Sequence, residues 1–183
     1  SKHMRNYDWC RRDTIGFVDQ LESECRRKLS RDPNFYVRWN GVGDLFQESI
    51  NALLEINKRL PDMPIWCVTR IPEFARQLAN VPNLWIHFSL DQSSLDRYTV
   101  VRELLMSATN LFFSYQCEPN ERIKELPEFI SVLFFDGYKI RDQNSIWAAS
   151  EVTCPLNLRE DISGTCAQCR RCFNGEAVLL TQK

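Results

Sequence analysis

A chain of 183 residues is long enough for one domain with a single core and too short for two ordinary domains. Hydrophobic residues make up 44% of it and charged residues 26%, which excludes disordered and collagen-like classes. With a net charge of −1 and a pI near 6.1, the overall charge does not favour nucleic acid as a partner. No apolar run approaches the ~18 residues of a membrane span and none near the start resembles a secretory signal, so we expect a cytoplasmic protein with no membrane partner.

The first predicted element is a helix that begins after Asp13 or Thr14, either of which can cap it. Apolar residues recur at helical spacing from Phe17 to Leu29, and basic residues near the end of this stretch suit the helix dipole. Residues 1–4 carry no fold prediction.

Five short and almost continuously hydrophobic runs follow, as in strands covered on both faces: residues 35–39, 65–68, 84–88, 111–115 and 130–135. Helical periodicity appears between them, at residues 45–60, 72–79, 94–106 and 121–126. This alternation predicts an α/β fold with a mostly parallel sheet of about five strands joined by right-handed crossovers. We expect a partial (βα) barrel, with an open doubly wound sheet as the alternative, because residues 41–44 form only a fragment of a Rossmann glycine-rich turn.

Polar residues follow the predicted strands, at the edge where ligand sites gather in parallel α/β folds. Any one of them can instead cap the next helix. Because they recur at strand after strand, we predict that they share one rim and bind a small polar or anionic ligand: Asn40, Asp44, Arg70, Ser89, Asp91 and Glu118.

Arg70 is the residue expected to hold an anion, because its guanidinium binds a carboxylate or phosphate through two parallel hydrogen bonds. Asp44 or Asp91 would be its partner when no ligand is bound. The alternative interpretation is an ion pair with a purely structural role.

His87 lies inside the third hydrophobic run, so strand alternation places it on the opposite sheet face from Ile86 and Phe88. We interpret it as a buried core residue rather than a ligand. Motifs of serine hydrolases, P-loop proteins and zincins are absent from the sequence, and we assign no catalytic residue.

Four of the eight cysteines form a cluster in the last thirty residues, with the spacing C-P-x10-C-x2-C-x2-C: Cys154, Cys166, Cys169 and Cys172. In a reducing compartment such a cluster indicates a metal site rather than disulfides. Four thiolates fit either a [4Fe–4S] cluster or Zn²⁺, and the two-residue gaps favour the iron–sulfur cluster as cofactor, with zinc as the alternative. We therefore expect residues 1–140 to form the α/β domain and residues 141–183 a metal-binding tail packed on it.

Four blocks of sequence together resemble a known family. They read Arg38-x-Asn40-Gly41-x-Gly43-Asp44-Leu45-Phe46, then Pro64-Ile65-Trp66-x-x-Thr69-Arg70, then Asn83-Leu84-x-Ile86-x-x-Ser89-Leu90-Asp91, and finally the cysteine tail. In this order, from about residue 35 to residue 173, they resemble the "gene product 88" family of phage and mobile-element proteins. The resemblance implies an architecture and a metal site more than an activity.

A weaker similarity reaches the radical S-adenosylmethionine enzymes. Gly41-Val42-Gly43-Asp44 is similar to their Gly-Gly-Glu-like turn, and Ser89-Leu90-Asp91 is similar to one of their strand ends. The Cys-x3-Cys-x2-Cys loop that defines those enzymes is absent from this sequence, so we do not expect standard radical chemistry.

Two functions are therefore considered. In the first, the chain is a metal-binding accessory protein of a phage or mobile element that acts as a binding module against a host or phage protein, and the metal holds the tail together. In the second, it is an iron–sulfur enzyme that acts on a small polar or nucleotide substrate at the rim. Whether the protein is an enzyme stays open at this point.

Overall fold

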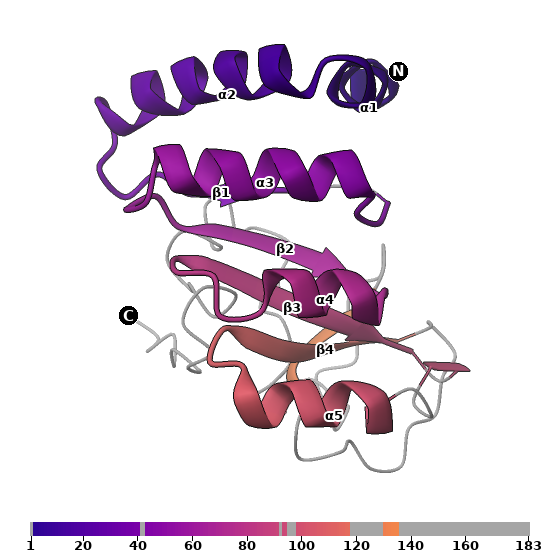
Figure 1. Cartoon of the computed structure of the whole chain (residues 1–183). Coiled ribbons are helices and arrows are strands. Elements are labelled where there is room, and N and C mark those ends of the chain that lie inside the picture. The colour runs from indigo at the N-terminus through magenta and orange to yellow at the C-terminus, as the bar shows by residue number, and fades with distance from the viewer. Residues whose placement is uncertain (1, 41–42, 92, 95–97, 118–129, 136–183) are drawn as a thin grey trace.

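A computed structural model describes residues 2–40, 43–91, 93–94, 98–117 and 130–135 (Figure 1). Its centre is a five-stranded sheet in which every neighbouring pair of strands is parallel. The strands are β1 (Val37–Arg38), β2 (Ile65–Thr69), β3 (Leu84–Leu90), β4 (Leu111–Cys117) and β5 (Ile130–Phe135). The predicted α/β fold with five parallel strands is therefore confirmed.

The strands lie side by side in chain order, from β1 to β5. A doubly wound sheet reverses its strand order at a switch point, and the described strands show no such reversal. The order is instead that of a (βα) barrel, in which each strand is added beside the previous one. In the described part of the chain β1 and β5 remain the two edges, so the sheet is open.

Within the described residues, three helices lie between consecutive strands and follow one another along the sheet: α3 (Gln47–Arg59), α4 (Pro72–Leu78) and α5 (Tyr98–Ser107) (Figure 1). α3 contacts α4, and α4 contacts α5, which places all three on the same face. The apolar side of α3, with Ile50, Leu53 and Ile56, is fully buried in the core. The opposing strand residues alternate along the sheet and make up the other half of this core: Ile65, Cys67, Leu84, Ile86, Phe88, Leu90, Leu111, Phe113 and Tyr115.

Two further helices form an outer layer on α3: α1 (Lys2–Arg12) and α2 (Thr14–Leu29) (Figure 1). The helix predicted after Asp13 is confirmed, and the carboxylate of Asp13 caps it by accepting a hydrogen bond from the Gly16 amide at 2.9 Å. A Cβ at position 16 would lie too close to that carboxylate, so the Asp13 side chain would have to shift if another residue replaced Gly16. The prediction did not include α1.

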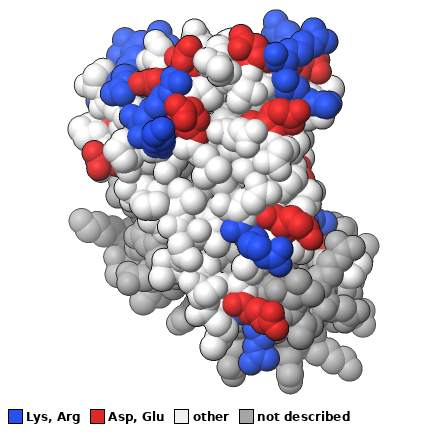
Figure 2. All heavy atoms as spheres, in the orientation of Figure 1, with Lys and Arg blue, Asp and Glu red and all other residues white. Residues whose placement is uncertain are grey.

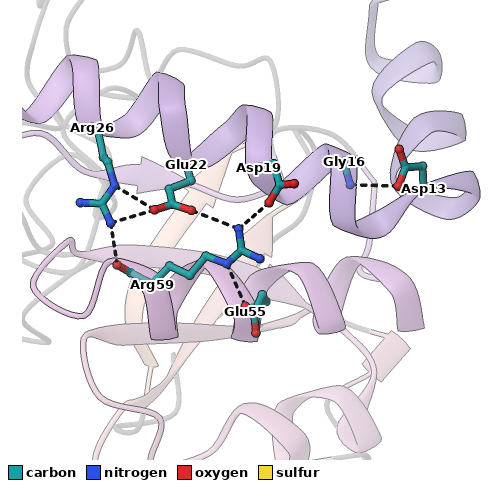
Figure 3. Close-up of polar contacts among 7 residues, drawn as sticks. All are labelled: Asp13, Gly16, Asp19, Glu22, Arg26, Glu55 and Arg59. Atoms are coloured by element: carbon teal, nitrogen blue, oxygen red, sulfur yellow. Dashed lines mark hydrogen bonds and ion pairs between the residues drawn. The ribbon is translucent and has the colours of Figure 1, made fainter.

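An ion-pair network joins α2 to α3 (Figure 3). Arg59 Nη1 lies 2.6 Å from Asp19 and 3.1 Å from Glu22, and its Nε lies 2.8 Å from Glu55. Glu22 also binds Arg26 at 2.7 Å. The hydrogen bonds to Asp19, Glu55 and Glu22 raise the pKa of Arg59. The pKa of Glu22 is lowered, chiefly by the hydrogen bond from Arg26 and next by that from Arg59. Figure 2 shows the resulting mixture of both charges on the surface of the two outer helices.

The sheet face opposite the helices carries a row of aromatic rings across three strands. The rings of Trp66 and His87 are 5.6 Å apart, and those of His87 and Phe112 are 6.0 Å apart. At one end of the row the guanidinium of Arg38 lies 4.8 Å from the Trp66 ring, as a cation–π contact. His87 is 0% exposed, so its interpretation as a buried core residue on this face is confirmed.

Asparagine side chains hold the loops at the amino-terminal edge of the sheet. Asn110 is 7% exposed, and its Oδ1 accepts a hydrogen bond from the backbone amide of Asn80 at 2.7 Å. Asn80 has a φ of 62°, a left-handed conformation that asparagine tolerates better than most residues. The Nδ2 group of Asn110 donates to three backbone carbonyls, those of Leu78, Val81 and Leu84.

Several expectations fall on residues that the structure does not describe. The helix predicted at residues 121–126 lies outside the described residues, and so does the whole tail from residue 141 with its four cysteines. Among the described residues, no helix has the length and apolar character needed to cross a membrane.

Candidate ligand-binding site

Polar side chains from four consecutive β-strands or their following loops gather at the carboxyl-terminal edge of the sheet. Parallel strands bring these ends to one edge. Asn40 and Asp44 come from the loop after β1, Arg70 follows β2, and the remaining members end β3 and β4: Ser89, Asp91, Ser114 and Gln116.

Asn40 continues the pairing of β1 with β2 through its side chain. Its Nδ2 donates to the carbonyl of Val68 at 2.6 Å, and its Oδ1 accepts from the amide of Val68 at 3.0 Å. The second hydrogen of Nδ2 bonds to the carbonyl of Gly43 at 3.0 Å. Asn40 therefore organises the loop, and its polar atoms are already engaged.

Asp44 ties the same loop to the end of β2. Its Oδ1 accepts from the Thr69 hydroxyl and from the Leu45 amide, both at 2.7 Å, and its Oδ2 accepts from the Arg70 amide at 2.8 Å. Thr69 is 1% exposed, so one end of this contact is buried. The carboxylate of Asp44 thus positions the backbone of Arg70 and not its guanidinium.

The Arg70 guanidinium is held between two neighbouring strands. Its Nη1 lies 2.7 Å from Asp91 Oδ2, and its Nη2 donates to Gln116 Oε1. The other oxygen of Asp91 accepts hydrogen bonds from the hydroxyls of Ser93 at 2.7 Å and Ser94 at 2.9 Å. The Ser93 bond is the largest cause that lowers the pKa of Asp91, and Ser94 and Arg70 add to it. Of the two acids expected beside Arg70, Asp91 is the one that pairs with it.

Two serine hydroxyls lie next to this cluster, two residues further from the edge of the sheet. Ser89 and Ser114 are direct register partners on β3 and β4, two residues before Asp91 and Gln116. Strand alternation therefore puts all four side chains on the same sheet face. The exposed fraction falls sharply from the sheet edge toward its interior. The side chain of Arg70 is 43% exposed, whereas Ser89 is 6% exposed and Ser114 is 0% exposed. In the described part of the chain, the Ser114 hydroxyl has no hydrogen-bond partner.

The structure brings five of the six predicted rim residues to this edge: Asn40, Asp44, Arg70, Ser89 and Asp91. Glu118 lies outside the described residues. From the polar residues after the fourth apolar run, the predicted set took Glu118 and not Gln116. It left out Ser114 because that residue lies inside the run. Counting back in steps of two from Gln116 places Ser114 on the same face, and that signal is present in the sequence.

The predicted metal ligands Cys154, Cys166, Cys169 and Cys172 lie outside the described residues. Within the described part of the chain, no group of three or more metal-binding side chains occurs. Three described cysteines are buried free thiols, Cys10, Cys25 and Cys67. Burial raises their pKa, to about 11 for the first two and to about 12 for Cys67.

A family model described as gene product 88 matches residues 1–175. No curated protein matches the chain, and no solved structure matches it.

Proposed function

The chain belongs to the gene product 88 family, and we propose that it binds a small polar or anionic ligand at the carboxyl-terminal edge of its sheet. The observation that carries this proposal is the Arg70 guanidinium, held by Asp91 from the end of β3 and Gln116 from β4 while 43% of the side chain remains exposed. A cation held in one orientation before the ligand arrives loses less entropy when it binds.

A purely structural role accounts poorly for this arrangement. An ion pair with this exposure contributes about 0–1 kcal/mol to stability. Without Arg70, the carboxylate of Asp91 would still accept hydrogen bonds from the hydroxyls of Ser93 and Ser94. Removal of the guanidinium therefore leaves no buried, unpaired charge.

The test compares the wild-type protein with Arg70→Ala in a thermal-shift screen against a panel of small polar and anionic compounds. We expect compounds that raise the Tm of the wild type and not that of Arg70→Ala, with the Tm of the unliganded variant within a few degrees of the wild type. Arg26→Ala is the matched control, because Arg26 is also a surface arginine paired with an acid and lies on α2, away from the sheet edge. A large fall in Tm with ligand responses intact would favour the structural role and contradict the proposal.

The second part of the proposal concerns the tail. The spacing of Cys154, Cys166, Cys169 and Cys172 supports one metal centre, a [4Fe–4S] cluster or zinc. Four thiolates that bind one metal would supply folding free energy to this segment. Metal analysis of anaerobically purified protein, together with its ultraviolet–visible spectrum, tests this and separates the two metals.

The two parts lead to different activities. A zinc centre would fit a binding module of a phage or mobile element directed at a host or phage protein. An iron–sulfur centre would favour an enzyme, distantly related to radical S-adenosylmethionine proteins, that acts on the ligand at the sheet edge.

A further inference from the structure

The acceptor groups at the sheet edge are already occupied. Both carboxylate oxygens of Asp44 accept hydrogen bonds, and so do both oxygens of Asp91. The amide oxygen of Asn40 accepts from Val68, and that of Gln116 accepts from Arg70. An incoming ligand therefore meets few unoccupied acceptors.

The hydrogen-bond donors at this edge, in contrast, are not all used. The Arg70 guanidinium carries five N–H groups, and within the described residues it uses Nη1 on Asp91 and Nη2 on Gln116. With its oxygen toward Arg70, Gln116 has its NH₂ group as a donor. The Ser114 hydroxyl is 0% exposed and has no partner among the described residues, a state that costs about 1–3 kcal/mol unless a bound group satisfies it. The edge thus favours a ligand rich in acceptors.

The register brings these donors within reach of one small group. Thr69 pairs with Phe88, so Arg70 follows in line with Ser89, and Ser89 pairs with Ser114. Neighbouring strands are about 4.8 Å apart and two residues along a strand span about 6.6 Å. A single group that accepts hydrogen bonds at about 2.8 Å on opposite sides can bridge such a distance.

We propose that the ligand carries a phosphate group, bound by Arg70 and Gln116 at the rim and by the Ser89 and Ser114 hydroxyls below. This rests on the proposed function, because it specifies the ligand of the same edge. The donors come from three strands and approach from different directions, which suits the tetrahedral oxygens of a phosphate better than the two coplanar oxygens of a carboxylate. The guanidinium takes two of these oxygens, and the hydroxyls take another.

The test titrates inorganic phosphate into the full chain by calorimetry, with acetate as a second probe. We expect phosphate to bind the wild type and to bind Ser114→Ala and Ser89→Ala at least tenfold more weakly. Unliganded Ser114→Ala should be as stable as the wild type or more stable, because it removes a buried hydroxyl without a partner.

Ser49→Ala is the matched control, since Ser49 is a buried serine of α3 whose hydroxyl accepts a hydrogen bond from Trp39 Nε1 at 2.8 Å. It should lose stability and bind phosphate like the wild type.

Three results would overturn the inference. Wild-type phosphate affinity in both Ser89→Ala and Ser114→Ala would show that these hydroxyls do not bind the ligand. If Arg70→Ala still lost phosphate binding, the proposed function would stand without the hydroxyls. Acetate binding as tight as phosphate binding would contradict the phosphate assignment. Absence of phosphate binding to the wild type at millimolar concentration would also contradict it, and a panel response lost in Arg70→Ala would then show that the edge binds another ligand.

Discussion

Replacement of Asp44 by alanine tests whether this carboxylate holds the sheet edge together. The substitution removes the acceptor for the Thr69 hydroxyl and for the backbone amides of Leu45 and Arg70. Thr69 is 1% and Leu45 is 4% exposed, so water cannot readily replace the lost acceptor at either residue. Each buried donor left unsatisfied costs about 1–3 kcal/mol, and with partial hydration at Arg70 we expect a total loss of about 3 kcal/mol.

For a domain of this size, 1 kcal/mol shifts the Tm by about 2–4 °C, so Asp44→Ala should unfold roughly 6–12 °C below the wild type. Circular dichroism during heating and urea denaturation measure this. Asp32→Ala is the control, because the exposed Asp32 carboxylate accepts one hydrogen bond, from the Asn34 amide at 3.0 Å, and its loss should change stability by no more than about 0.5 kcal/mol. Equal stability of the two variants would refute the reasoning.

Four more predictions concern polar side chains and cysteines. Asn110→Ala should lower the free energy of unfolding by about 2–4 kcal/mol in urea denaturation, because three backbone carbonyls and one backbone amide lose their partner. A loss no greater than that of the exposed Asn51→Ala would contradict this. The lowered pKa of Asp91 means that its contribution to stability is present above the unfolded value near 3.8 and is lost as the pH falls through the folded value. Asp91→Asn should therefore make the free energy of unfolding fall less steeply below about pH 4, as urea denaturation at a series of pH values would measure. The same pH dependence in the variant and the wild type would contradict the lowered pKa of Asp91. At pH 8 iodoacetamide should spare Cys10, Cys25 and Cys67 in the native protein, because burial keeps their pKa at about 11–12, whereas chelation should open the four tail cysteines to labelling, as mass spectrometry would detect. Cys169→Ser should lower metal content and Tm together, and unchanged metal stoichiometry would remove it from the ligand set.

The hydrophobic pattern predicted the sheet well, because almost all residues of its central strands β2 and β3 are buried, on both faces. The run at 84–88 identified β3, and only the end differed, since Ser89 and Leu90 extend the strand to the edge. The helix capped by Asp13 was predicted from cap and periodicity together. The preceding α1 was not, because it is mostly polar and among its described side chains only Cys10 is buried.

The candidate site was predicted only in outline. Strand ends located Arg70 and Asp91, but the sequence does not show which of the two acids pairs with the guanidinium. In the structure both oxygens of Asp44 already accept hydrogen bonds from Leu45, Thr69 and the Arg70 amide, so Asp91 is the partner. The alternation of the strand puts Ser114 on the same face as Gln116 from the sequence alone, but only the strand register shows that Ser114 lies beside Ser89.

The shortness of β1 has a consequence for how the protein behaves at high concentration. An edge strand normally offers a row of unpaired backbone groups on which another chain can add a strand and begin to aggregate. β1 has only two residues, and one of them, Arg38, is an exposed charge. Beyond it the pairing with β2 passes to the side chain of Asn40, so this side of the sheet presents almost no template for a second copy.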